Sequence, residues 1–233
     1  MATAKAQKVS GGRRARGSIS ADEIIAGAFE VAGRVSLSEF SMPMLAKHLG
    51  VGVTSIYWYF RKKEDLLDAM ADKANEEYHA ATPFIGADNW QDGLRRHFRR
   101  MHQAFRTQPV LVELTLLRPY PHSADRTSMQ ATAAKLDSMV AAMVGAGFTA
   151  EQALEIYLSL LAHVCGAAMV EHQGIFATYD GGLPRGADET ASAVPLLAEL
   201  AAKGHRIDNV EDATFEFTFE AILAQAERSL GHE

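Results

Sequence analysis

The chain has 233 residues, of which 48% are hydrophobic, and this length and composition suffice for a sizeable buried core. Its one cysteine, Cys165, excludes an intramolecular disulfide and a cysteine-rich zinc site, and we expect it to be a small buried residue. No apolar run approaches the length of a membrane span, and the N-terminus lacks the apolar core of a signal peptide. We therefore expect a cytoplasmic protein.

Charge is distributed unevenly along the chain. The net charge is −6, but residues 1–67 hold ten Lys and Arg against six Asp and Glu, which gives +4 there and −10 in the rest. This asymmetry predicts a basic module on an acidic body. A basic patch supplies the salt-sensitive part of DNA affinity, while an acidic body is repelled by the phosphates.

Residues 1–17 are rich in cations and glycine and show no hydrophobic periodicity, so we predict a disordered basic arm. The arm would either contact DNA phosphates or a neighbouring minor groove, or serve only as a solubilising tail. The sequence favours neither alternative. The cations of the arm are Lys5, Lys8, Arg13, Arg14 and Arg16.

Residues 18–62 predict a small helical domain. Its first helix opens on a capping box, in which Glu23 can reach back to Ser20, and it ends near Gly33. Apolar side chains recur on one face of this helix and should pack against two shorter helices that follow. A domain of this size is expected to be marginally stable alone, so it should pack against the next helix as well.

The two shorter helices lie in the stretch of residues 40–67. Ser41 can cap the first of them, Gly50 ends it, and the second covers residues 53–60. Two short helices joined by a tight turn are typical of a helix-turn-helix, whose second helix enters the major groove of DNA.

The aromatic run at residues 56–60 has a second interpretation as buried core, and the basic triplet at residues 61–63 could be a solvated helix end. Consecutive aromatic residues on a short helix point in every direction, so some of them must be exposed. Exposed phenols beside three cations suit hydrogen bonding to phosphate better than burial. We therefore favour the helix-turn-helix.

The remainder of the chain is expected to be helical. Residues 63–81 predict a connector helix, and a break at residues 82–86 begins a C-terminal domain over residues 82–233. A turn-rich loop is expected over residues 174–190. The helices expected in this domain cover residues 90–107, 109–117, 123–146, 149–173, 192–203 and 210–230.

The helix expected at residues 90–107 carries an outer basic face. The face could be a second DNA surface, but charge runs of this kind favour a solvated helix face. Its cations are Arg95, Arg96, Arg99, Arg100 and Arg106.

The run from Leu45 to Leu67 resembles the DNA-binding signature of the TetR family of transcriptional regulators. The resemblance is strong over residues 18–68, and beyond them the helix pattern is closest to the tetracycline repressor branch. It implies an all-α fold, with an N-terminal three-helix DNA-binding domain and a C-terminal helical domain for ligand binding and dimerisation. The matching residues are Leu45, Ala46, Leu49, Gly50, Val51, Ile56, Tyr57, Tyr59, Phe60, Lys63, Leu66 and Leu67.

The resemblance also implies a function. The protein would be a homodimeric repressor that binds a palindromic operator and releases the DNA when a small, mostly apolar molecule binds to its C-terminal domain. Two-fold symmetry has a physical basis too, because one short recognition helix reads only a few base pairs. In the family, the helices that correspond to residues 149–173 and 210–230 form a four-helix dimer interface. No cofactor and no metal are expected.

Eight residues of the helix-turn-helix are expected to meet DNA. Thr54, Ser55 and Tyr59 are candidates for base edges or nearby phosphates. Ser41, Tyr57 and Lys63 are candidates for phosphates.

The two other candidates follow from the resemblance. Trp58 matches a position that contacts DNA in the tetracycline repressor, with packing against its own domain as the alternative. Val53 stands where relatives often have a polar base-reading residue, and Met42 and Pro43 replace the usual polar pair. Sparse base readout is therefore expected.

A pocket for the effector is expected inside the C-terminal helices, lined mostly by apolar groups. The resemblance implies that some subset of inward-facing residues lines it, although each alone fits plain core better. Leu114 stands where the tetracycline repressor uses a histidine to hold a magnesium-bound drug, so we do not expect magnesium–tetracycline as the effector. The candidate lining residues are Phe98, Met101, Phe105, Met139, Met143, Tyr157 and His163.

A helical enzyme and a protein-binding adaptor are the alternatives. The sequence contains no HExxH, GxSxG, Walker loop or GxGxxG motif, which disfavours an enzyme. The basic arm and the helix-turn-helix disfavour an adaptor.

Overall fold

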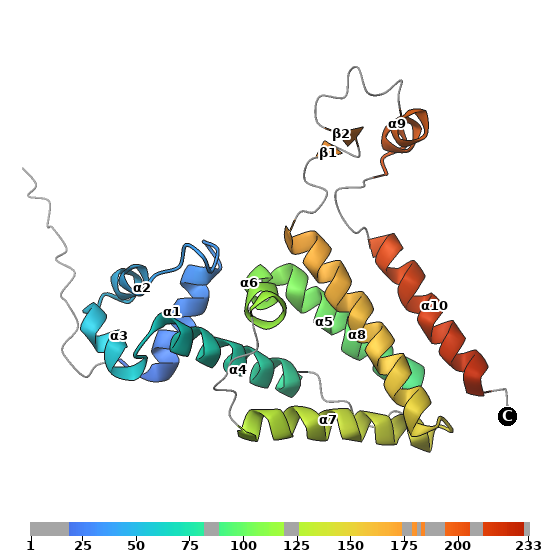
Figure 1. Ribbon diagram of the computed structural model, residues 1–233, viewed down its shortest axis with the longest axis horizontal. Helices are drawn as coiled ribbons and strands as arrows, with labels where there is room; N and C mark the ends of the chain where they lie inside the picture. Colours follow the sequence, from blue (N-terminus) through green and yellow to red (C-terminus); the bar gives the residue numbers. More distant parts are fainter. Residues whose placement is uncertain are drawn as a thin grey trace, which may run out of the picture. The chain divides into compact units, whose positions relative to one another are not determined.

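The computed structural model describes residues 19–81, 89–118, 126–173, 179–180, 183–184, 194–205 and 212–230. Over these residues the regular secondary structure is helical apart from β1 (Tyr179–Asp180) and β2 (Leu183–Pro184), which pair antiparallel. The predicted all-α class is confirmed (Figure 1). The chain divides into two compact units, Met1–Lys73 and Ala74–Glu233.

The N-terminal unit contains α1 (Ala21–Ala32), α2 (Met42–Leu49), α3 (Val53–Tyr59) and the first part of α4 (Lys63–Ala81). The predicted capping box opens α1, with the Glu23 amide donating to Ser20 Oγ at 3.2 Å and the Ser20 amide donating to Glu23 Oε2 at 2.9 Å. Ser41 caps α2, because its hydroxyl accepts from the Met44 amide at 3.4 Å.

Helices α1 and α2 approach each other closely at Gly27. A Cβ added at Gly27 would lie only 2.6 Å from Cδ2 of Leu49, so the missing side chain leaves room for this leucine. Ile24, Leu45 and Ile56 bring one fully buried side chain from each of the first three helices. Burial of this kind is the main stabilising term for so small a unit.

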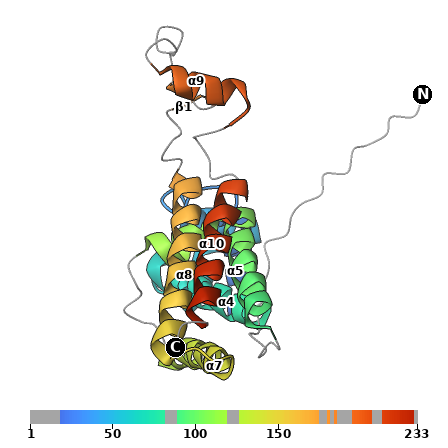
Figure 2. The same ribbon diagram turned by 90° about the vertical axis from the view of Figure 1, so that its right-hand side faces the viewer.

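The C-terminal unit begins with α5 (Trp90–Thr107), α6 (Pro109–Val112) and a π-helical turn, η1 (Glu113–Leu117). It continues with α7 (Arg126–Gly145), α8 (Ala150–Gln173), α9 (Pro195–Ala202) and α10 (Asp212–Leu230). Figures 1 and 2 show α5, α8 and α10 side by side. Their shared core is formed by buried apolar side chains that include Leu94, Phe98, Met143, Leu160, Val164, Phe215, Phe219 and Leu223.

The helix α8 opens on a second capping box. The Gln152 amide donates to Thr149 Oγ1 at 3.2 Å, and the Thr149 amide donates to Gln152 Oε1 at 2.9 Å. By length and composition, α8 is also apolar enough to cross a membrane, which we did not expect from the sequence. This is weak evidence, because a core helix passes the same test, and Leu160 and Val164 of α8 are fully buried in the helical core.

Several boundaries differ from the predictions by a few residues. The helices expected at residues 123–146, 192–203 and 210–230 begin at Arg126, Pro195 and Asp212. The apolar helix expected at residues 109–117 is interrupted, because its second half winds into the π-helical turn. The arm of residues 1–17, the break at residues 82–86 and most of the expected loop at 174–190 lie outside the described residues.

Candidate nucleic-acid interface and effector pocket

The turn between α2 and α3 depends on a glycine. Gly50 has φ = +67°, a left-handed conformation that side-chain-bearing residues adopt at a cost, and it ends α2 as predicted. The Val51 amide donates to the carbonyl of Ala46 at 3.0 Å and closes the turn. The turn therefore fixes the direction in which α3 leaves α2.

Aromatic side chains project from α3. Trp58 is 78% exposed, Tyr57 44% and Tyr59 37%, whereas Ile56 and Phe60 are buried. The aromatic run thus divides between surface and core, as its spacing on a short helix requires. Of the other candidates on α3, Thr54 is exposed and Val53 and Ser55 are half-buried.

Tyr59 is engaged within the protein. Its hydroxyl donates to the carbonyl of Ile19 at 2.7 Å, and its ring meets that of Trp58 edge to face, with centroids 4.7 Å apart. From the sequence we expected Tyr59 at base edges or phosphates and did not foresee this bond. The bond joins residues 40 positions apart, so local pattern carries no signal for it.

Lys63 is also held by its own domain. Its ammonium donates to the carbonyl of Leu37 at 2.5 Å and lies 5.7 Å from the centroid of the Phe40 ring. These contacts tie the first residue of α4 to the segment that precedes α2. A phosphate contact by Lys63 would have to use another of its three donors.

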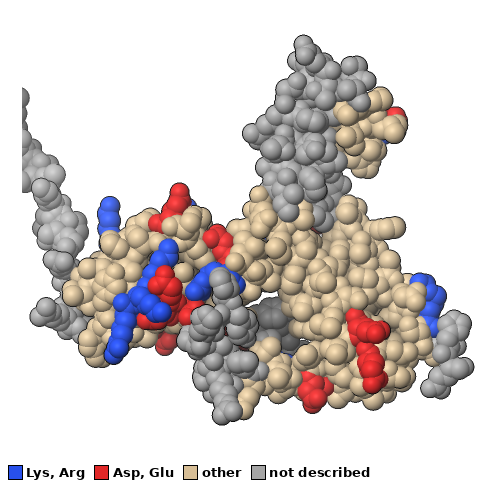
Figure 3. Space-filling model, in the orientation of Figure 1, with Lys and Arg blue, Asp and Glu red and all other residues tan. Residues whose placement is uncertain are grey.

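The helical part of the N-terminal unit is not itself basic. Residues 18–67 carry five Lys and Arg against six Asp and Glu, whereas residues 1–17 carry five Lys and Arg and no acid. Figure 3 shows basic and acidic side chains interspersed on this unit. The positive excess noted in the sequence therefore belongs entirely to the arm.

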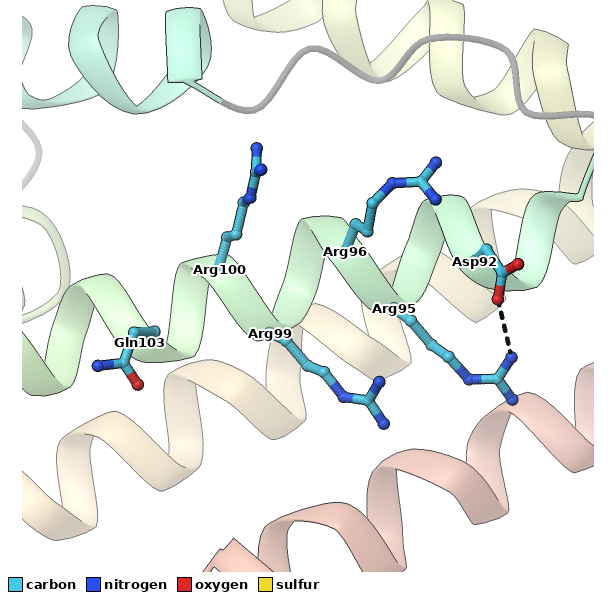
Figure 4. Close-up of a pocket in the computed structure, with 6 residues that line it drawn as sticks. All are labelled: Asp92, Arg95, Arg96, Arg99, Arg100 and Gln103. Carbon is cyan, nitrogen blue, oxygen red and sulfur yellow. Dashed lines mark hydrogen bonds and ion pairs between the residues drawn. The ribbon is translucent and has the colours of Figure 1, made fainter.

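The basic face of α5 splits into two groups. Arg95 and Arg99 point to the α10 side of the helix, and Arg96 and Arg100 point the opposite way (Figure 4). A surface hollow of about 510 Å³ is lined by Asp92, Arg95, Arg96, Arg99, Arg100 and Gln103.

Arg95 and Arg99 form a ladder of ion pairs with α10. Arg95 binds Glu220 through two bonds of 3.0 and 2.8 Å, and Arg99 bridges Glu216 and Glu220 at 2.6 to 2.9 Å. The bond to Arg95 lowers the pKa of Glu220, and the bond to Glu220 raises the pKa of Arg95. Arg99 is exposed and Arg95 half-buried, so the ladder lies at the solvent-facing surface, and the sequence did not show that these two cations pair with α10.

Of the seven residues predicted to line the effector pocket, only Phe105 lines the pocket described next, and the others lie in or near the helical core. Phe98, Met139 and Met143 are buried in the helical core. Met101 and Tyr157 are partly buried against it, and burial raises the pKa of the Tyr157 phenol. His163 donates to the carbonyl of Phe215 at 2.9 Å. Phe105 lines a pocket, described next.

A pocket of about 200 Å³ lies between α5, α6 and α8. Apolar walls come from Phe105, Pro109, Val112 and Ala168, and polar groups come from Arg106, Glu171 and His172. A mostly apolar cavity with a few polar groups is the usual character of a small-molecule site. In the sequence Glu171 and His172 stand as an isolated pair, because their partners are on distant helices.

A polar cluster surrounds Glu171 of this pocket. His102 Nε2 lies 3.4 Å from Glu171 Oε1, and Arg106 Nε lies 3.8 Å from Glu171 Oε2. His172 Nε2 lies 3.6 Å from Oε1 of Glu113. His102 is 6% exposed, and burial lowers its pKa although Glu171 acts in the opposite direction. Burial therefore favours the neutral imidazole at His102, and its Nε2 and Glu171 Oε1 are buried without a hydrogen-bond partner among the described residues.

No cluster of three or more His, Cys, Asp or Glu suited to a metal ion occurs among the residues that the structure describes. Leu114, at the position where the resembled repressor has a histidine, is buried. An apolar side chain offers no ligand to a hard cation such as Mg²⁺.

Two families match the chain. Residues 24–70 match the family described as "Bacterial regulatory proteins, tetR family", and residues 82–228 match "Tetracyclin repressor-like, C-terminal domain". An HTH-type transcriptional repressor of Mycobacterium tuberculosis is 41% identical over 93% of this chain and 83% of the relative. The class A tetracycline repressor protein from transposon 1721 in Escherichia coli is 27% identical over 86% and 85%.

A solved structure shares the fold. It is a variant TetR from Acinetobacter baumannii AYE in complex with minocycline, with a TM-score of 0.59 and 18% identity over 91% of this chain and 98% of that one.

Proposed function

The chain belongs to the tetR family of bacterial regulatory proteins, and from that premise we propose that it is a ligand-responsive repressor acting as a homodimer on a palindromic operator. Residues 1–17 are assigned as a basic arm, 18–62 as the DNA-binding domain, 63–81 as a connector helix, and 82–233 as the effector-binding and dimerisation domain. Such a protein acts in the cytoplasm of a bacterium, where the chromosome is.

The observation that carries this proposal is the exposed face of α3. Thr54, Tyr57 and Trp58 are exposed on a helix whose direction is fixed by the Gly50 turn. Hydroxyl and phenol groups at this position can reach base edges and phosphates once α3 lies in the major groove. Ser41, Val53 and Ser55 complete the proposed contact surface, and Tyr59 and Lys63 contribute mainly by holding the domain together.

Dimerisation is supported by apolar side chains left at the surface of α8 and α10. Phe217 is 79% exposed, Leu158 49% and Leu154 39%. Much of the surface over these two helices carries neither basic nor acidic side chains (Figure 3). Exposed apolar patches on a helical protein mark association surfaces, and a two-fold dimer places two copies of α3 on successive half-sites.

The effector is proposed to bind in the pocket between α5, α6 and α8. Phe105, Pro109 and Val112 suit an apolar body, and Glu171 suits a hydroxyl or amino group that donates a hydrogen bond. Minocycline in the related structure supports a small molecule with such groups, but Leu114 argues against a magnesium-dependent mode.

Release of DNA is proposed to be a population shift. The effector binds a body conformation whose recognition helices do not match successive major grooves, and so it weakens operator binding. Coupling is reciprocal, so DNA must weaken effector binding by the same factor. Full conversion from bound to released requires a differential affinity of about 10⁴.

The test is fluorescence anisotropy on a labelled fragment from upstream of the protein's own gene, compared with random DNA of equal length. We expect preferential binding that falls steeply with salt and is lost in Trp58→Ala. Leu196→Ala is the matched control, because Leu196 is 73% exposed on α9 and outside the proposed interface. Equal losses in both variants would contradict the assignment of α3.

If the protein binds this fragment no better than random DNA, the operator lies elsewhere. Genomic fragments that the protein binds should then be selected and sequenced to find it. If selection also recovers no sequence, the repressor function is wrong. A recovered operator then becomes the assay for effectors, and Glu171→Gln should weaken release by a hydroxylated or amino-bearing effector without changing operator affinity.

A further inference from the structure

Glu171 brings a nearly buried carboxylate to the wall of the pocket between α5, α6 and α8. Its side chain is 14% exposed, and its Oε1 atom has no hydrogen-bond partner among the residues that the structure describes. His102 Nε2 lies 3.4 Å from Oε1 but is itself left without a hydrogen bond, and Arg106 Nε, at 3.8 Å from Oε2, is too distant for one. A buried carboxylate is costly unless opposite charge and hydrogen bonds compensate it. Glu171 can therefore still accept a hydrogen bond from a bound molecule.

The charges around Glu171 leave an excess of negative charge. Arg106 is shared between two carboxylates, because its Nη1 also donates to Oδ1 of Asp212 on α10. Burial lowers the pKa of His102, so its neutral form is favoured and it contributes little positive charge. One guanidinium thus serves two carboxylates, and one negative charge is left over among these four side chains.

The other basic residue of the pocket wall does not reverse this balance. His172 Nε2 lies 3.6 Å from Oε1 of Glu113, and both side chains are about four-fifths buried. A proton on His172 would therefore face the carboxylate of Glu113. An anionic ligand would meet a carboxylate beside each basic group of the wall, whereas a cationic ligand would find a charge to neutralise at Glu171.

The size of the pocket limits the body of the ligand. Its volume is about 200 Å³, and a cavity of about 150 Å³ is enough to hold a benzene ring. The walls formed by Phe105, Pro109, Val112 and Ala168 are apolar. Phe105 also supplies an aromatic ring, to which a cation is attracted. The pocket therefore fits one ring or a compact aliphatic group that carries a cation on a short chain.

We propose that the effector pocket selects a protonated amine on a compact apolar body, and that the carboxylate of Glu171 is its counter-ion. This inference rests on the proposed function, because it names the class of effector that the same pocket takes. An ammonium group has three donors, so it can satisfy Oε1 of Glu171 and the neutral imidazole of His102 together. A neutral alcohol can donate only one hydrogen bond and brings no charge.

The experiment measures binding of three small probes to the full-length protein without DNA, by isothermal titration calorimetry at pH 7.5. The probes share a phenyl ring on a short chain and differ in charge: 2-phenylethylamine is a cation, 2-phenylethanol is neutral and phenylacetate is an anion. Each is titrated into the wild type, Glu171→Gln and Glu227→Gln. Glu227→Gln is the matched control, because it removes an exposed carboxylate from α10 and leaves the pocket unchanged.

We expect the wild type to bind 2-phenylethylamine about tenfold to a hundredfold more tightly than 2-phenylethanol, the usual value of a hydrogen bond to a charged group. Phenylacetate should bind more weakly than either. Glu171→Gln should remove most of the preference for the amine and change the affinity for the alcohol less than about threefold. Glu227→Gln should behave like the wild type.

Two results would overturn the inference. One is a wild type that binds the alcohol or the anion as tightly as the amine, or none of the three, and this comparison does not depend on how any variant folds. The other is a preference for the amine that survives in Glu171→Gln, which would place the cation elsewhere.

The proposed function fails in a different measurement. The three probes are also added to the wild-type complex with the operator fragment, and only 2-phenylethylamine should release the DNA. An amine that binds through Glu171 but releases no DNA would support this inference and contradict the proposed mechanism of release. A wild type that prefers no operator would contradict the repressor function, and that result is obtained without any ligand.

Discussion

The imidazole of His102 lies flat on the ring of Phe215, with ring centroids 3.8 Å apart and 8° between the planes. This stack joins α5 to α10 inside the helical core, and the edge of the imidazole faces Glu171 on α8. A histidine in this position has to stay neutral unless Glu171 compensates its charge, because burial lowers its pKa.

Acid should therefore destabilise the protein through His102. In the unfolded chain a histidine takes up a proton near pH 6.5, whereas folded His102 resists protonation, so stability is lost as the pH falls below about 6.5. Urea denaturation at pH 7.5, 6.5 and 5.5 measures this loss. His102→Phe keeps a ring on Phe215 and should flatten the pH dependence, while His205→Gln, at an exposed position, should leave it unchanged. Equal pH dependence in wild type and His102→Phe would contradict the prediction.

The ladder between α5 and α10 predicts an acid effect at lower pH. Arg95 lowers the pKa of Glu220, so this pair stabilises the fold above about pH 4.5 and loses its effect as the pH falls through the lowered pKa. Glu220→Gln should cost less than about 1 kcal/mol at pH 7, because the pair is partly exposed. The difference from wild type should shrink toward pH 3 and in high salt. Glu227→Gln, an exposed carboxylate on the same helix, is the control for chemical denaturation.

The turn between α2 and α3 predicts a cost for any side chain at position 50. Gly50→Ala forces alanine into a left-handed conformation at about 1–2 kcal/mol, although the space around the added Cβ is open. The expected result is a lower melting temperature of the N-terminal unit. Gly145→Ala provides the comparison, because the space there is also open but φ is not positive, and it should be neutral or slightly stabilising. A similar loss in both variants would mean that the backbone conformation is not the cause.

The apolar surface of α8 and α10 predicts the oligomeric state. Phe217→Lys and Leu158→Lys each place a charge in the proposed dimer interface and should convert dimer to monomer, as measured by sedimentation velocity. Leu196→Lys changes a leucine on α9 that is more exposed than Leu158, and it should leave the dimer intact. A wild-type protein that is monomeric at micromolar concentration, or that stays dimeric with both charges present, would exclude this interface.

Local sequence signals predicted much of this structure, and the reasons are visible in single residues. Ser20 with Glu23, Ser41 and Gly50 act through hydrogen bonds or backbone angles within a few positions, so their effect can be inferred from spacing. The ends of α5 were equally predictable, because its apolar stripe is regular and Asn89 and Gln108 flank it.

The interactions that were missed connect residues far apart in the sequence. Arg95 and Glu220 are 125 positions apart and Tyr59 and Ile19 are 40 apart, so only the tertiary arrangement could identify the partners. The same applies to Glu171. In the sequence it stands only beside His172, and nothing in that pair indicates that Glu171 lies next to His102. The π-helical turn after α6 also has no signature in the apolar run that precedes it.

The way α4 leaves the N-terminal unit restricts where the molecule can bend. The Lys63 ammonium donates to the carbonyl of Leu37, Leu66 and Met70 of α4 are fully buried, and the N-terminal unit ends at Lys73. Buried side chains and the Lys63 bond oppose sliding or rotation of that half of α4. We therefore expect any hinge that links effector binding to operator binding to lie at or beyond Lys73, outside the compact unit that carries α3.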